Sequence, residues 1–272
     1  MSDSVSAVIP KEIGLLVGLE HLIIKNNERL VGEIPTEIGE LIGCYQLGIY
    51  NNHIQGAIPI EITKLEKLIY LNLSGNYLTG EVPNEIGSLE NLKRLILDGN
   101  QLIGDFIPIH YSKMESLKLL SLSNNSFSGT LGQEIEFLKS VEHLYLDQNS
   151  FSGSMPSELG LLSELKSLAL GYNNINDEIP KQIEKLTQLE FLSLNNNQMN
   201  GMIGDLFQDM LILNHLFLHN NNFSDNLLGS SSICSLRQNR LVDFWVDCGG
   251  LNASINCPVE CCTKCCLEME CY

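Results

Sequence analysis

Two histidines near the end of the chain, His215 and His219, are the residues whose type and spacing first suggest chemistry. Imidazole nitrogens bind zinc at roughly 2.1 Å. In a strand, however, positions four apart lie on one face about 13 Å from each other, which is too far to share an ion. No column of Asp or Glu flanks the pair. The spacing therefore predicts no metal site.

Cysteines are the second group that could do chemistry. Those near the C-terminus are Cys234, Cys248, Cys257, Cys261, Cys262, Cys265, Cys266 and Cys271. An even number in a short loop-rich segment is typical of disulfides in an oxidising compartment, with many possible pairings. A zinc half-site at Cys262-Thr263-Lys264-Cys265 is the alternative, but zinc needs a second pair of spaced ligands. We therefore favour disulfides here, and a buried apolar thiol at Cys44.

The remaining polar residues do not assemble into a catalytic motif. The sequence holds no phosphate-binding loop, nucleophile elbow or kinase signature. Its Ser, His and Asp residues are spread over repeated positions, and an open sheet has no water-excluding cleft to collect them. The sequence therefore predicts a protein that is not an enzyme and that uses no cofactor.

A repeat dictates how these residues are positioned. Asparagine recurs every 24 or 25 residues, at Asn27, Asn52, Asn76, Asn100, Asn125, Asn149, Asn173, Asn197 and Asn221. An aliphatic pair stands five and three residues before each Asn, as Leu192 and Leu194 do before Asn197. Residues alternate sides in a strand, so this pair predicts a short strand with one buried face. One repeat cannot bury that face alone, so successive coils must stack into a parallel sheet.

The asparagines are expected to form a structural ladder. An Asn amide both donates and accepts, so stacked Asn side chains can satisfy the backbone groups that the turn leaves unpaired. Asp could not donate. The two spacings of 25 residues place one-residue insertions at Glu28-Arg29 and Phe106-Ile107, where we expect outward bulges.

After the Asn, many repeats continue as x-Leu-x-Gly-x-Ile-Pro-x-x-Ile-Gly-x-Leu, and Tyr77-Leu78-Thr79-Gly80-Glu81-Val82-Pro83 begins the cleanest copy. Glycine permits positive φ, and proline ends the strand before a short helical turn. This pattern resembles the plant-specific class of leucine-rich repeats found in receptor-kinase ectodomains, receptor-like proteins and polygalacturonase-inhibiting proteins. The resemblance implies an α/β solenoid, a right-handed superhelix with a parallel β-sheet on its concave face and short 3-10 or helical turns on its convex side.

The two ends differ from the repeats. Residues 1–15 are expected to be a truncated half-repeat, residues 16–228 nine leucine-rich repeats, and residues 229–272 a Cys-rich C-terminal cap. Leu241-x-x-Phe244-x-Val246 echoes the repeat and predicts one last strand. The tail from Cys234 to Cys266 resembles one seen in leucine-rich-repeat proteins of diatom-type algae.

Side chains between the buried aliphatics should form the exposed sheet face. In the last four repeats they include aromatic residues suited to anchoring a partner. These candidates are Tyr145, Tyr172, Phe191, His215, Phe217 and His219. Aromatic residues are also common in sheets through propensity alone. Four glycosylation sequons begin at Asn72, Asn124, Asn222 and Asn252, and the first two map to the exposed face of earlier repeats.

A formal charge of −17 makes nucleic acid a poor partner and would attract a basic one. The chain shows no secretory signal and no run of apolar residues long enough to span or insert into a membrane. Our first interpretation is a module that recognises a protein or peptide in receptor-like signalling or defence, extracellular or membrane-associated in its full-length parent. The alternatives are a secreted inhibitor of a cell-wall-degrading enzyme and a structural wall or matrix protein.

Overall fold

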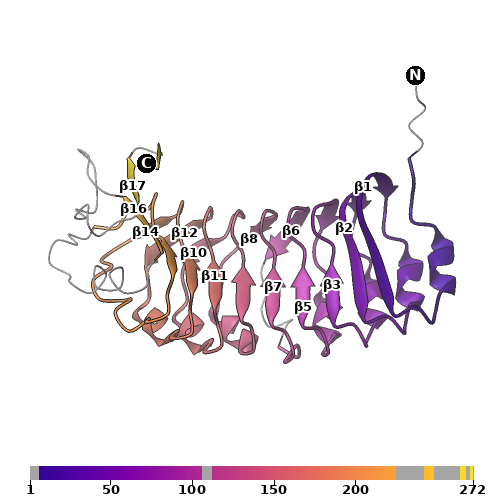
Figure 1. The fold of residues 1–272 in the computed structure, drawn as a ribbon, viewed down its shortest axis with the longest axis horizontal. Coiled ribbons are helices and arrows are strands. Elements are labelled where there is room, and N and C mark those ends of the chain that lie inside the picture. Colours follow the sequence, from indigo (N-terminus) through magenta and orange to yellow (C-terminus); the bar gives the residue numbers. More distant parts are fainter. Residues whose placement is uncertain (1–5, 106–111, 225–241, 248–263, 268–269, 272) are drawn as a thin grey trace, which may run out of the picture. The chain divides into compact units, whose positions relative to one another are not determined.

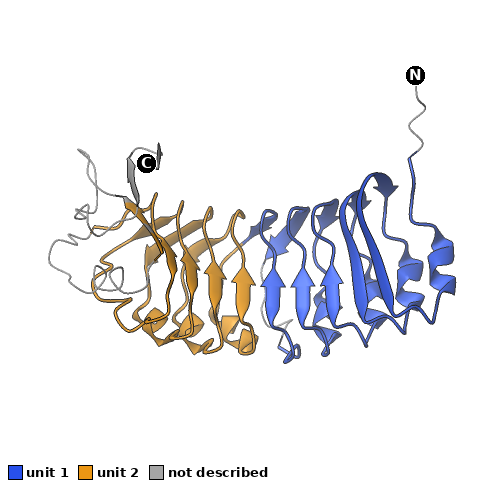
Figure 2. Ribbon diagram, viewed as in Figure 1, with its two compact units in different colours: residues 1–128 blue, residues 129–272 orange. Residues whose placement is uncertain are grey.

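The computed structural model describes residues 6–105, 112–224, 242–247, 264–267 and 270–271. It divides into two compact units, Met1–Ser128 and Gly129–Tyr272 (Figure 2). Each unit is a stack of similar coils, and each coil contributes one strand to a parallel sheet (Figure 1). Among the described residues, no helix has the length and apolar character needed to span a bilayer.

In unit 1 the main sheet follows chain order. It consists of β1 (His21–Gly32), β2 (Gln46–Gly56), β3 (Tyr70–Asn72), β5 (Arg94–Ile96) and β7 (Leu119–Ser121). The end of β2 continues into a second layer with β4 (Tyr77–Gly80), β6 (Gln101–Asp105) and β8 (Ser126–Ser128). The turns are the 3-10 helices η1 (Lys11–Leu15), η2 (Thr36–Glu40), η3 (Ile60–Lys64) and η4 (Asn84–Ser88). The register of β1 on β2 shifts between Asn27 and Val31, where the sequence places an insertion.

Unit 2 repeats this plan. Its main sheet runs through β9 (His143–Tyr145), β11 (Ser167–Ala169), β13 (Phe191–Ser193), β15 (His215–Phe217), β16 (Asp243–Asp247) and β17 (Lys264–Leu267), with β18 (Glu270–Cys271) antiparallel at the edge. The second layer is β10 (Ser152–Ser154), β12 (Asn174–Glu178) and β14 (Gln198–Asn200). The turns are η6 (Gln133–Leu138), η7 (Ser157–Leu161) and η8 (Lys181–Lys185). Strand β16 confirms the expected extra strand near Phe244.

The core is a column of leucines that stack coil on coil. Leu144, Leu168, Leu192 and Leu216 are directly paired in register and fully buried. Each buried leucine contributes about 2 kcal/mol relative to an exposed one. Cys44 takes the place of a leucine in unit 1; it is buried and free, as expected, and burial raises the pKa of its thiol.

The turns begin where the sequence places proline. Six of the described 3-10 helices follow a proline with extended ψ: Pro10, Pro35, Pro59, Pro83, Pro156 and Pro180. The glycine inside the turn has a separate role, because stacked turns approach each other closely there. A Cβ added to Gly160 would lie 2.8 Å from Cβ of Gln182 and still closer to the Gln182 carbonyl oxygen. This Ile-Gly or Leu-Gly position therefore sets how tightly the coils pack.

The asparagine side chains bridge neighbouring coils. Asn173 is 8% exposed, and its amide donates to the carbonyl oxygens of Leu146, Leu170 and Gly171 at 3.1–3.2 Å. Its Oδ1 accepts the N–H of Phe151 from the preceding coil at 3.0 Å. The same arrangement recurs at Asn76, Asn100, Asn125, Asn197 and Asn221. Each of these side chains therefore satisfies backbone groups of two coils.

Candidate functional site

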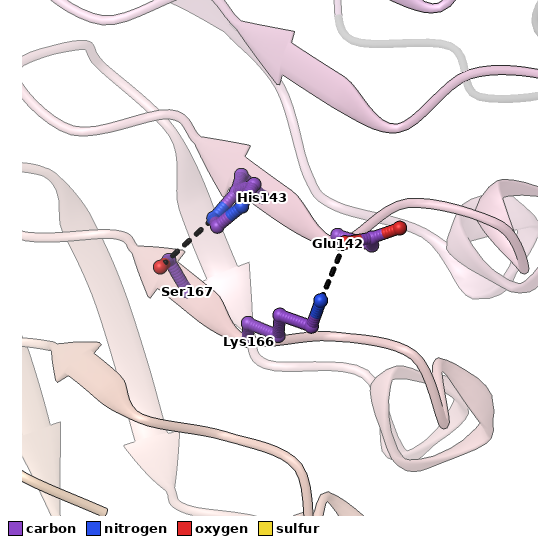
Figure 3. Close-up of polar contacts among 4 residues, drawn as sticks. All are labelled: Glu142, His143, Lys166 and Ser167. Atoms are coloured by element: carbon purple, nitrogen blue, oxygen red, sulfur yellow. Dashed lines mark hydrogen bonds and ion pairs between the residues drawn. The ribbon is translucent and has the colours of Figure 1, made fainter.

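Two polar pairs join β9 and β11, one within the strands and one between the residues just before them. Lys166 Nζ donates to Glu142 Oε2 at 2.7 Å, and His143 Nδ1 lies 3.0 Å from Ser167 Oγ (Figure 3). Hydrogen bonding to Glu142 raises the pKa of Lys166, and the charge of that carboxylate adds to the shift. Lys166 is therefore held as a cation within an ion pair.

Farther along the face, ring contacts join five residues that we call the aromatic cluster: Phe191, His215, Phe217, His219 and Trp245. Phe191 packs against His215 and Phe217 with ring centroids 6.1 and 5.7 Å apart. Phe217 meets Trp245 edge to face at 5.5 Å, and the ring centroid of His219 lies 5.4 Å from that of Trp245. The cluster therefore spans β13, β15 and β16, three adjacent strands.

The structure brings together four of the six residues that the sequence suggested for binding a partner. His219, however, is only 6% exposed, so its expected place on the surface is wrong. Tyr145 stacks on His143 at 6.2 Å instead of joining the cluster. Strand β11 separates the two groups, and its Ser167 and Ala169 are small and buried.

Sequence reasoning missed Trp245 and Asp243, both on β16. In the sheet Asp243 is paired with His215 and Trp245 with Phe217. The sequence shows no column of Asp or Glu beside the histidines, but one acidic residue does lie there, since His215 Nδ1 is 2.9 Å from Asp243 Oδ2. The alternation around Phe244 and Val246 was a signal that could have placed Asp243 and Trp245 on the exposed face. Within the described ranges, no group of three or more His, Cys, Asp or Glu side chains could hold a metal ion.

This repeated geometry is similar to that of known proteins. A family model described as leucine rich repeat matches residues 45–102, and a second with the same description matches residues 116–138 and 140–162. No sequence among curated proteins matches the chain. The ectodomain of the membrane receptor kinase GASSHO1/SCHENGEN3 from Arabidopsis thaliana, solved with CASPARIAN STRIP INTEGRITY FACTOR 2, is 31% identical with a TM-score of 0.84 over 90% of this chain.

Two further structures are similar. A TDR receptor is 30% identical with a TM-score of 0.79 over 88% of this chain, and the plant peptide hormone receptor RGFR1, solved with RGF2, is 27% identical with 0.76 over 89%. The fold is a leucine-rich-repeat solenoid. The chain spans only 29% to 42% of the length of these three receptor chains.

Each leucine-rich repeat turns sharply one residue before its ladder asparagine. This position has positive φ in all nine repeats, and it is Asn or Gly in seven of them: Asn26, Asn51, Gly75, Gly99, Asn124, Asn196 and Asn220. Gln148 and Tyr172 are the exceptions, with φ of 55° and 54°. A bulky aromatic residue is strained in this region. Because Tyr172 is also 54% exposed, burial in the core does not account for it.

Replacing Tyr172 with Asn is therefore expected to raise the free energy of unfolding by about 1 kcal/mol, since Asn tolerates the left-handed conformation. Urea denaturation followed by circular dichroism measures the change. The reverse substitution at the same position of the next repeat, Asn196→Tyr, serves as the matched control and should destabilise. Equal or lower stability of Tyr172→Asn would contradict the strain.

The main sheet of unit 1 carries a different, polar group at its start. His21 lies between Tyr45 and Gln46, with Nε2 2.6 Å from Tyr45 Oη and Nδ1 3.0 Å from Gln46 Oε1. Desolvation raises the pKa of Tyr45, and the charge of Glu20 adds to the effect. These residues hold one another in place and present no ring cluster comparable with that of unit 2.

Only some of the sequon asparagines, and none of the C-terminal cysteine side chains, can be placed on the described surface. Asn72 is 8% exposed, so its expected place on an open surface is wrong; it donates to Tyr70 Oη and accepts from Ser74. Asn124 and Asn222 are exposed, and Asn252 lies outside the described residues. So do Cys234, Cys248, Cys257, Cys261 and Cys262, while only the backbone is described for Cys265, Cys266 and Cys271.

Proposed function

We propose that this chain is a non-catalytic recognition module that binds an extended peptide, or an extended segment of a protein, on the exposed face of the unit 2 sheet. The observation that carries the proposal is the aromatic cluster, which places contacting rings on three adjacent strands. Tyr and Trp, with their large rigid side chains, are common anchors of protein interfaces. Except for the buried His219, its rings are half-buried, and clustered apolar groups that stay partly exposed typically mark an interaction surface.

The dimensions of the face suit such a ligand. Strands of one sheet lie about 4.8 Å apart, so the five strands from β9 to β16 span about 20 Å. An extended chain covers about 3.4 Å per residue, so about six peptide residues could cross the face. The similar plant receptors solved with CASPARIAN STRIP INTEGRITY FACTOR 2 and with RGF2 lend support to a receptor-like role in an extracellular, plant-type protein.

A library of random peptides displayed on phage provides a probe that requires no knowledge of the natural partner. The affinity of a selected, fluorescently labelled peptide is then measured by anisotropy. Replacing both Phe191 and Phe217 with Ala should weaken binding at least about tenfold, because large rings near the centre of an interface contribute most of its energy.

The matched control removes equivalent apolar side chains from the turns. Phe137 in η6 and Leu161 in η7 are 39% and 48% exposed. The pair Phe137→Ala and Leu161→Ala should leave the affinity unchanged. Selection of no peptide, or equal binding by the Phe191→Ala/Phe217→Ala protein, would overturn the proposed function.

A further inference from the structure

Tyr172, in the turn between β11 and β12, destabilises the fold in two ways. Its φ of 54° is strained for a bulky aromatic residue. It also interrupts a second row of amides, formed by the residues that precede the ladder asparagines. Asn51 Nδ2 donates to Asn26 Oδ1 of the preceding coil at 3.1 Å. Asn220 Nδ2 donates to Asn196 Oδ1 in the same way at 2.8 Å.

The amide of Asn196 shows the consequence of this interruption. The preceding member of its row is Tyr172, whose side chain carries no amide oxygen there to accept the bond. Among the described residues, the buried Nδ2 of Asn196 has no hydrogen-bond partner. An unpaired buried donor lowers the stability of a fold. The Asn row is therefore broken at Tyr172.

Packing of the Tyr172 ring offsets neither effect. The residue is 54% exposed, and within the described ranges its side chain enters no hydrogen bond and no ring contact. Strain that persists at an exposed residue is typical of positions that bind a ligand. Tyr172 is therefore a candidate contact residue that the aromatic cluster does not include.

The surroundings of Tyr172 are uncharged. The residues immediately before and after the ladder asparagines of unit 2 lie between its two sheet layers. Apart from Tyr172 and Ser150 they are all amides, and we call them the amide rim: Gln148, Asn174, Asn196, Gln198, Asn220 and Asn222. Asn149 N–H donates to the Tyr172 carbonyl oxygen and Asn173 N–H to that of Asn196, so positions 148, 172 and 196 adjoin in consecutive coils. Gln148 and Asn174 are exposed on either side of the ring.

Amides around an exposed aromatic ring suit an uncharged sugar. Each amide holds a donor and an acceptor close together, which matches neighbouring hydroxyl groups of a pyranose. The tyrosine ring offers a flat apolar surface to the C–H face of the sugar. A formal charge of −17 opposes sugars that carry carboxylate or sulfate groups.

The spacing of the coils favours a chain of sugars over a single one. Neighbouring strands lie about 4.8 Å apart, which is close to the length of one sugar in an extended β-1,4-linked chain. Such a chain, lying along the amide rim, would place about one pyranose at each coil. A curved α-1,4-linked chain of the same sugar would lose this match after one or two coils.

We propose that Tyr172 and the amide rim bind an extended, uncharged polysaccharide of β-1,4-linked pyranoses. Tyr172 stacks on one sugar ring, while Gln148 and Asn174 form hydrogen bonds with hydroxyl groups beside it. The site lies in the turns that follow the main sheet, and it does not depend on the peptide-binding face proposed above.

Isothermal titration calorimetry with cellohexaose and with β-1,4-mannohexaose tests the proposal. At least one of them should bind saturably, and maltohexaose and hexagalacturonic acid should bind several-fold more weakly or not at all. Tyr172→Asn should weaken binding about tenfold, because the stacked ring is lost. Tyr172→Phe keeps the ring and should stay within about twofold. Gln148→Ala and Asn174→Ala should each weaken binding several-fold.

The matched control is Tyr77→Asn, the same substitution at a tyrosine of β4 that is 47% exposed, and it should leave sugar binding unchanged. Tyr172→Asn should bind less sugar while it unfolds at a higher urea concentration, so misfolding cannot mimic the loss. Binding of neither β-1,4-linked hexasaccharide, equal binding of maltohexaose, or unchanged affinity of Tyr172→Asn would overturn the proposal. Weaker binding of the phage-selected peptide by Tyr172→Asn, without sugar binding by the unmodified protein, would instead assign Tyr172 to the peptide face.

Discussion

Replacing Asn173 with Asp is expected to lower the free energy of unfolding by about 4 kcal/mol, the typical cost of leaving a buried charge without a partner. The introduced carboxylate would face the carbonyl oxygens of Leu146, Leu170 and Gly171, to which Asn173 now donates. Urea denaturation followed by circular dichroism measures the loss. Burial favours the protonated carboxyl, so the deficit should be largest at neutral pH and shrink as the pH falls.

The neighbouring residue provides the control. Asn174 is exposed, and its backbone N–H donates to the Phe151 carbonyl oxygen, while no described hydrogen bond involves its side chain. The same substitution, Asn174→Asp, should change stability by less than about 0.5 kcal/mol. A comparable loss in both variants would show that the added charge, and not the ladder, is responsible.

Replacing Gly160 with Ala should destabilise the protein by about 3 kcal/mol, the upper part of the range for overpacking. The new methyl group would collide with the backbone carbonyl and Cβ of Gln182 in the next turn. The neighbour that must move is mostly backbone, so rotation of a side chain cannot relieve the clash. Thermal and urea denaturation would both report the change.

Gly18 allows the same substitution without the clash. A Cβ built on Gly18 meets nothing within 4 Å. Gly18→Ala should therefore be neutral or slightly stabilising, because alanine restricts the unfolded chain more than glycine does. If Gly160→Ala were equally harmless, close stacking of the turns would not explain this glycine.

The fold could be predicted because the repeat encodes it redundantly. The leucine pair, the glycine, the proline and the asparagine recur together. Where one position departs from the pattern, the others still indicate the repeat. The leucine-rich-repeat solenoid and its 3-10 turns are confirmed in this way. The approach of Gly160 to Gln182 was not predicted, since it depends on how closely two turns stack.

The site was only partly predictable, for two physical reasons. Trp245 follows Phe217 by 28 residues instead of 24, so it fell outside the regular columns although its strand was expected. How deeply a side chain is buried depends on the neighbouring side chains as well as on its position in the repeat. His219 occupies an outward position, yet the adjacent ring of Trp245 covers part of it.

The bridging asparagines make each stack of coils asymmetric along the direction of the chain. Asn76 serves the Ile49 carbonyl oxygen and the Ile54 N–H of the coil before it, and Asn100 does the same for Leu73 and Leu78. Deleting a coil therefore has unequal effects on its two neighbours. Of the contacts that the asparagines make, the neighbour toward the N-terminus loses the partner of two main-chain groups, whereas the one toward the C-terminus loses only a partner of its own amide side chain. As far as the asparagine ladder is concerned, loss of the coil on the C-terminal side is therefore the more damaging of the two.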